Sequence, residues 1–105
     1  MSFPRRGEIF RGPGKKKIRP LLVVSNDQGN RYSADVVVIP GTTKNIDTIY
    51  PVEILVCGEG LPKFTKFQAD SIFTIYKSDL GKKIGKLNSG TMDSIATALR
   101  IELAL

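Results

Sequence analysis

The chain has 105 residues, and its proportions of 41% hydrophobic and 25% charged residues are those of one globular domain covering residues 1–105. It carries a net charge of +6, has no histidine and contains one cysteine, Cys57. These counts exclude an intrachain disulfide, a Cys–His nucleophile and a zinc site built from cysteine and histidine. The longest apolar runs fall far short of the roughly 20 residues that a membrane span requires, so we expect a cytoplasmic protein.

Positive charge is concentrated at the start of the chain. Seven of the sixteen basic residues lie in the first nineteen positions, where Glu8 is the one acid. These seven are Arg5, Arg6, Arg11, Lys15, Lys16, Lys17 and Arg19. Such a focused positive segment favours a polyanionic partner, because neutralising phosphates releases their counterions.

Short strands dominate the predicted elements. A first strand is expected at residues 8–11, and a loop follows because glycine and proline occupy residues 12–14. Residues 20–24 and 36–39 are continuous aliphatic runs typical of strands buried on both faces, which we place at the centre of a sheet. Between them, residues 26–30 have the composition of a turn. A polar loop at residues 41–45 is followed by predicted strands at residues 52–56, 65–68, 71–75 and 83–87.

Only the C-terminal segment has the periodicity of a helix. Its apolar residues recur at three- and four-residue spacing, at Met92, Ile95, Ala96, Leu99 and Leu103. We expect Ser89 or Thr91 to cap this helix and its apolar face to pack on the sheet. The predicted fold is therefore mainly β with a C-terminal α-helix, as a strongly curved antiparallel sheet or small barrel.

The missing histidine also limits the chemistry, because it removes the commonest general acid and base. No phosphate-binding loop, dinucleotide fingerprint or metal-binding cluster of acids stands in the sequence, so we expect no cofactor and no metal. RNA cleavage by internal attack remains possible, because its nucleophile, the 2′-hydroxyl, belongs to the substrate. The protein then needs to position the phosphate and stabilise charge, which an arginine fork and a hydroxyl can do.

Arg19 and Thr42 are the residues that fit this requirement. Arg19 stands just before the first aliphatic run, and Thr42 and Thr43 follow the second. If the two runs form neighbouring antiparallel strands, the start of one lies beside the end of the other. Spacing alone favours a simpler interpretation, in which Arg19 is a surface residue and the threonines only satisfy turn hydrogen bonds.

Segments along nearly the whole chain resemble the MazF/PemK/Kid toxin family. The most specific are residues 18–27 (Ile-Arg-Pro-Leu-Leu-Val-Val-Ser-Asn-Asp), 30–33 (Asn-Arg-Tyr-Ser) and 38–43 (Val-Ile-Pro-Gly-Thr-Thr), with further matches at residues 7–9, 50–54, 60–61, 77–78, 80–87 and 98–101. Their order and spacing carry the resemblance. It implies an SH3-like small barrel of the MazF/CcdB type with a terminal helix, and a homodimer.

The resemblance also implies a function and its residues. The expected activity is metal-independent, sequence-specific cleavage of single-stranded mRNA to a cyclic phosphate and a 5′-hydroxyl, inhibited by an acidic MazE-like antitoxin that binds DNA together with the toxin. Arg19 and Thr42 correspond to the family's catalytic pair. The residues expected to contact RNA are Lys15, Lys16, Lys17, Asn26, Asn30, Arg31, Thr43, Lys44 and Ser71.

Two departures from the family pattern concern RNA recognition. The loop at residues 12–17 is short and rich in lysine, which would favour backbone phosphate over bases and relax sequence preference. Ser71 and Phe73 replace glutamine and arginine that many relatives carry, so a base preference is not transferable. Phe73 could stack on a base, although an aromatic residue in an alternating strand is more often part of the core.

Two other functions remain open on the sequence. A CcdB-like toxin has the same type of fold but acts by binding gyrase, and fold does not settle function. A noncatalytic RNA-binding barrel would bind RNA with a steep salt dependence and leave it intact.

Overall fold

The computed structural model describes residues 2–13 and 17–105 of the chain. Most of the elements within these residues are short antiparallel strands. The strands are β1 (Glu8–Pro13), β2 (Ile18–Val23), β3 (Asp35–Thr42), β4 (Glu53–Val56), β5 (Thr65–Gln68), β6 (Phe73–Tyr76) and β7 (Lys83–Lys86). The helices are α1 (Asp27–Tyr32) and α2 (Ser89–Leu103), with the 3-10 turns η1 (Ala69–Ser71) and η2 (Lys77–Asp79).

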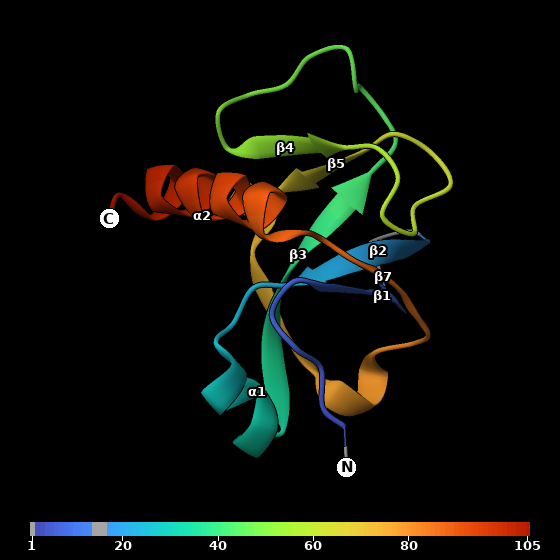
Figure 1. Ribbon diagram of the computed structural model, residues 1–105, viewed down its shortest axis with the longest axis vertical. Helices are drawn as coiled ribbons and strands as arrows, with labels where there is room; N and C mark the ends of the chain where they lie inside the picture. Colours follow the sequence, from blue (N-terminus) through green and yellow to red (C-terminus); the bar gives the residue numbers. More distant parts are fainter. Residues whose placement is uncertain (1, 14–16) are drawn as a thin grey trace.

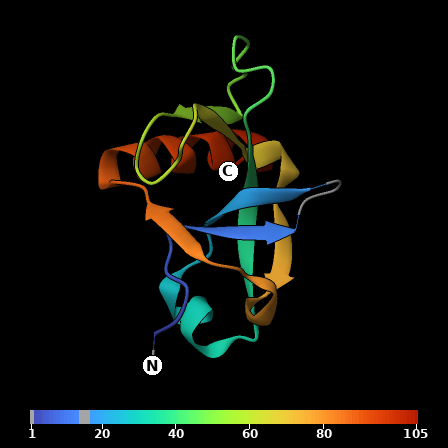
Figure 2. The ribbon, with the colours of Figure 1, turned by 90° about the vertical axis from the view of Figure 1, so that its right-hand side faces the viewer.

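The strands form one strongly curled sheet in the order β4-β5-β3-β2-β1-β7, with β6 also paired to β3 (Figures 1 and 2). One edge of β3 is divided between two partners, because its first half pairs with β6 and its last residues pair with β5. The sheet consequently bends along β3 into a half-barrel, and α2 lies against β4 and η1. The predicted fold, mainly β and barrel-like with a C-terminal helix, is confirmed.

The two central strands are buried on both faces, as their aliphatic runs predict. Leu22 and Ile39 belong to one core cluster, which α2 completes with Ile95. Leu21 and Val38 belong to a second cluster on the opposite face of the sheet. Because alternate residues of a strand point to opposite faces, two cores require the unbroken apolar runs found in β2 and β3.

The loop expected from residue 12 begins later, because Gly12 and Pro13 extend β1 and pair with Arg19 and Ile18. Two further local predictions were wrong because both missed an asparagine cap. Asn26 accepts a hydrogen bond from Gly29 N at 2.8 Å and starts the short helix α1, where a turn was expected. Asn88, rather than Ser89 or Thr91, caps α2 by accepting from Thr91 N at 2.8 Å. In each case the asparagine oxygen satisfies a backbone N–H of the first helical turn that has no partner within the helix.

Two exposed regions lie at opposite ends of the long axis of the molecule. The loop that follows β3 lies at one end of this axis and α1 lies at the other (Figures 1 and 2).

The strand expected at residues 71–75 begins at Phe73, because residues 69–71 form η1. None of the helices in the described part of the chain has the length and apolar character needed to cross a membrane.

Candidate functional site

Arg19 and Thr42 lie at the same end of the sheet. The antiparallel β2–β3 pair brings Leu21 opposite Pro40, so Arg19, two residues before Leu21, and Thr42, two residues after Pro40, lie just beyond the same end of this ladder. Both residues also share a face by strand alternation. Thr42 is in turn paired with Lys66 of β5, so the start of β2, the end of β3 and the start of β5 meet at this point.

Gly41 allows this close approach of three strands. A Cβ atom at Gly41 would lie 2.6 Å from Thr65 Cγ2, 3.0 Å from Phe67 Cε1 and 3.0 Å from Pro20 Cγ. The missing side chain therefore lets β3 pass between β2 and β5 directly beside Thr42.

A small cavity of about 130 Å³ opens beside Arg19. Arg19, Thr43 and Thr65 line it together with two cations that the sequence did not single out for this site, Arg11 and Lys63. Arg11 is brought there by the β1–β2 register, in which it faces Pro20. Arg11 could have been predicted as a site residue from its place in the basic N-terminal segment. No sequence pattern around Lys63 indicates that it belongs to the site.

The cavity has the electrostatics of an anion site. Within residues 2–13 and 17–105, the ion pairs are Lys66 with Glu53 and Lys83 with Glu8, so the guanidinium of Arg19 is not neutralised by a carboxylate of these residues. An unpaired, half-buried guanidinium presents a fork of N–H donors that matches two oxygens of a phosphate. The arrangement can therefore hold a phosphate beside Arg19, next to the loop that begins at Thr42.

Thr42 ends β3 and starts an exposed loop. Its Oγ1 accepts a hydrogen bond from Lys44 N at 3.2 Å, which turns the chain after the strand. Thr43 contributes to the cavity beside Arg19, and Lys44 is exposed on the loop. The structure thus gathers four of the residues expected from the sequence, namely Arg19, Thr42, Thr43 and Lys44.

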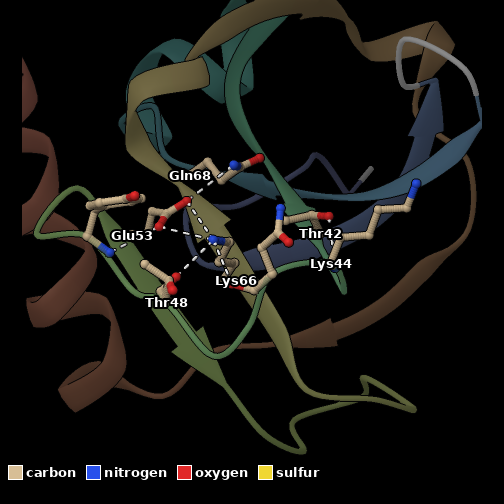
Figure 3. A network of polar contacts seen from close by, with 8 residues as sticks. Thr42, Lys44, Thr48, Glu53, Lys66 and Gln68 are labelled. Carbon is tan, nitrogen blue, oxygen red and sulfur yellow. Dashed lines mark hydrogen bonds and ion pairs between the residues drawn. The ribbon is translucent and has the colours of Figure 1, made fainter.

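A buried ion pair lies under this loop (Figure 3). Lys66 Nζ is 3.2 Å from Glu53 Oε2, and each side chain is 5% exposed. Burial raises the pKa of Glu53, but the hydrogen bond from Tyr50 N and those from Lys66 and Gln68 outweigh it, so that the net pKa lies below its usual value. The carboxylate is therefore charged at neutral pH.

The α1 region holds three residues that were expected near the RNA. Asn26 and Arg31 are exposed there, on the order of 20 Å from Arg19 given the rise per residue of β2. Asn30 is fully buried, and its side chain bonds to Ser25 and to Asp27 Oδ1. The expectation that Asn30 contacts RNA is therefore wrong, because its polar atoms are occupied in holding α1 to β2.

Of the remaining residues that were expected to contact RNA, those that the structure describes do not line the cavity beside Arg19. Lys17 is exposed just before β2, and Lys15 and Lys16 lie outside the described residues. Ser71 is exposed at the end of η1, and Phe73 is half-buried against the second core cluster, as an aromatic core position predicts.

A larger hollow of about 730 Å³ lies near α1, away from Arg19 and Thr42. Arg31, Tyr32, Phe3, Arg5 and Lys77 are among the residues that line it. Size alone would favour this hollow as the functional site, but Arg19, the arginine that the family resemblance indicates, lines the smaller cavity together with Thr43.

The chain matches, over residues 5–103, the family described as PemK-like, MazF-like toxin of type II toxin-antitoxin system. It belongs to the PemK/MazF toxin family. This confirms the family indicated by the sequence. The match runs from before β1 to the end of α2 of this PemK/MazF toxin.

Relatives of this PemK/MazF chain include named ribonucleases. Endoribonuclease MazF4 of Mycobacterium tuberculosis is 35% identical over 105 residues, covering 100% of this chain and 97% of the relative. Endoribonuclease EndoA of Bacillus subtilis is 37% identical over 110 residues, covering 96% of this chain and 95% of the relative. A solved mycobacterial endoribonuclease in complex with its cognate antitoxin is 35% identical, with a TM-score of 0.87 and coverage of 97% of this chain and 96% of that chain.

Proposed function

We propose that this PemK/MazF toxin is an endoribonuclease that cuts single-stranded mRNA in the cytoplasm, with Arg19 and Thr42 as its catalytic residues. The observation that carries the proposal is the shared end of β2 and β3, because Arg19 and Thr42 each stand two residues beyond the Leu21–Pro40 pair. The guanidinium there is not neutralised by any carboxylate of the described residues. The names of the relatives support RNA as the substrate class.

The proposed reaction is an internal transfer at phosphorus. The 2′-hydroxyl attacks the adjacent phosphorus, and the bond from phosphorus to the 5′ oxygen breaks. The 2′-hydroxyl loses a proton and the leaving 5′ oxygen gains one, so the products are a cyclic phosphate and a 5′-hydroxyl without consumption of water. Arg19 stabilises the negative charge on the phosphorane oxygens, and the Thr42 hydroxyl orients one of them.

The exposed residues around the cavity supply the rest of the proposed RNA contacts. Arg11, Lys63 and Thr43 line the cavity itself, and Lys44 and Lys17 flank it. Three further residues, Lys15, Lys16 and Ser71, stay in the proposed set on the resemblance alone. Arg31 and Asn26 would contact a more distant part of the same RNA strand, because α1 lies at the other end of the long axis.

We infer two partners, a second copy of the chain and an acidic antitoxin. The antitoxin complex of the mycobacterial relative supports the second inference. The basic residues of the N-terminal segment give an acidic tail an electrostatic target that overlaps the RNA contacts. A saturating antitoxin peptide should therefore displace a single-stranded RNA oligonucleotide, and simultaneous binding of both would contradict occlusion. Sedimentation of the purified toxin tests the homodimer.

The cleavage proposal is tested with a long single-stranded RNA in the presence of a chelator. We expect discrete new ends with the wild-type toxin and none with Arg19→Ala. Arg100→Ala removes one positive charge from α2, which contributes no residue to the lining of the cavity, and should cut like the wild type. RNA left intact by the wild-type toxin would instead favour a gyrase-binding toxin or a noncatalytic RNA-binding barrel.

A further inference from the structure

The loop between β3 and β4 is held by hydrogen bonds to one buried cation, the ammonium of Lys66. Lys66 is 4% exposed, and its ammonium donates to Asn45 O at 3.0 Å and to Thr48 O at 3.0 Å. Its third contact is the carboxylate of Glu53, at 3.2 Å. A lysine ammonium has three N–H donors, so all three are used.

Glu53 completes the arrangement by binding the other end of the same loop. Its Oε1 accepts from Tyr50 N at 3.0 Å, and its Oε2 lies 3.3 Å from the amide donor of Gln68. The pair therefore holds the loop at three backbone positions, residues 45, 48 and 50 (Figure 3).

The loop has few other means of holding its shape. Residues 43–45 and 47–51 are exposed, and Ile46 between them is only half-buried. The backbone hydrogen bond from Thr48 N to Asn45 O is long, at 3.3 Å, and Asn45 adopts a left-handed conformation with a φ of 55°. A segment with this much exposed backbone opens easily unless side chains restrain it.

Lys66 also links the loop to the proposed catalytic strand end. It is the residue paired with Thr42 across the β3–β5 ladder, so its backbone fixes Thr42 while its side chain fixes the loop that Thr42 begins. A buried ion pair adds little net stability compared with apolar residues of the same volume. Its distinctive contribution here is geometric, because each N–H donor of a buried ammonium needs an acceptor at a defined position.

We infer that Lys66 and Glu53 are positioning residues for RNA cleavage, which hold the loop so that Thr42, Thr43 and Lys44 meet the substrate in one arrangement. This inference rests on the proposed ribonuclease function. Neither side chain touches RNA in this arrangement, because both are buried. Their effect on the reaction passes through the loop and through Thr42.

The test replaces both partners together, since removal of one would leave the other charge buried alone. In Glu53→Gln/Lys66→Met, the oxygen of the introduced amide can still accept from Tyr50 N while the three ammonium contacts disappear. We expect kcat on a short single-stranded RNA to fall by about tenfold to a hundredfold, as misplacement of reacting groups commonly does, with KM changed much less. Amide hydrogen exchange of residues 44, 48 and 50 should accelerate in the same protein.

Two controls separate positioning from loss of stability or charge. Ile95→Val removes a methylene from the core under α2 and should lower the melting temperature with no effect on kcat well below melting. Lys86→Met removes one exposed charge from β7, at the opposite edge of the sheet order from the β4–β5 pair. Its kcat should match the wild type.

The outcomes distinguish the inference from the function on which it rests. A folded double variant that keeps the wild-type kcat, or whose loop amides exchange no faster, would overturn the positioning role while the ribonuclease proposal stands. A wild-type toxin that cuts no RNA would overturn both, and the failure would be visible before any variant is compared.

Discussion

The ammonium of Lys66 and the carboxylate of Glu53 lie 3.2 Å apart where each side chain is only 5% exposed. Hydrogen bonds to the charged carboxylate hold the pKa of Glu53 below its ordinary value of 4.5, although burial acts in the opposite direction. A lowered pKa in the folded state means that the unfolded chain binds the Glu53 proton first as the pH falls.

Stability should therefore depend on pH through Glu53. Its contribution is fully present above the ordinary pKa of 4.5 and is lost as the pH falls through the lower pKa of the folded state. Urea unfolding at a series of pH values measures this loss. In Glu53→Gln/Lys66→Met the free energy of unfolding should decline less steeply over the same acidic range. Equal slopes in the two proteins would show that Glu53 titrates alike in the folded and unfolded chains.

The hydroxyl of Thr42 should be needed for turnover. Thr42→Val keeps the shape and β propensity of the side chain but removes the oxygen that accepts from Lys44 N, to which we assign the orientation of the phosphate. Loss of one oriented donor typically lowers kcat by roughly 10²-fold. Thr42→Ser keeps the hydroxyl and should retain most activity, so a serine variant as slow as the valine variant would contradict the assigned role. Single-turnover cleavage rates provide the measurement.

Arg31 should matter only for long RNA. It is exposed at the α1 end, where its guanidinium stacks 5.3 Å from the Tyr32 ring centre, and it lines the larger hollow. Arg31→Ala should weaken binding of long single strands and leave that of oligonucleotides confined to the Arg19 cavity unchanged. For each lost phosphate contact, the slope of log K against log salt should fall by about 0.7. Titrations at several salt concentrations measure both affinities. An equal loss of affinity for short and long RNA would contradict this placement of Arg31.

Asn30 should behave as a stability residue. Its amide donates to Ser25 O at 2.9 Å and Ser25 Oγ donates to its carbonyl oxygen, while Val37 N donates to the same hydroxyl at 3.0 Å. Asn30→Ala should lower the free energy of unfolding by about 1–3 kcal/mol, since it leaves buried polar groups without partners. Activity well below melting should be unchanged. Gln28→Ala on the exposed side of α1 is the matched control and should alter neither quantity.

The sequence predicted the fold because its clearest patterns are those of apolar residues, whose burial is the main favourable contribution to folding. The unbroken aliphatic runs of β2 and β3 can be buried only in strands with a core on each face, and the helical spacing from Met92 to Leu103 has one apolar stripe. Residues 26–30 were misread because asparagine and glycine serve turns and helix caps alike. The choice was made by the contacts of Asn30 with Ser25, which sequence periodicity does not encode.

The sequence predicts which strand ends meet at the candidate site, because this depends on strand order, but it does not predict the cavity residues that other strand pairs and loops contribute. Placing Arg19 beside Thr42 required only that the two central strands be antiparallel neighbours. Arg11 and Lys63 reach the same cavity through the β1–β2 register and a loop, neither of which a local pattern specifies. The pairing of Glu53 with Lys66 likewise follows from the β4–β5 register, in which Lys66 faces Leu55 and Glu53 faces Gln68.

The sheet joins the first strand of the chain to the last. β1 pairs with β7, and Leu87 N donates to Gly7 O at 2.9 Å although the two residues are far apart in the sequence. Closing so long a loop comes late and slowly in folding, because its entropy is lost before the contacts are gained. A nascent chain that has not yet reached residue 83 therefore leaves one edge of β1 without a partner, and α2 has not yet covered Leu22. We therefore expect the outer edge of β1 and the Leu22 face of the sheet to be the last parts of the toxin that are covered during synthesis.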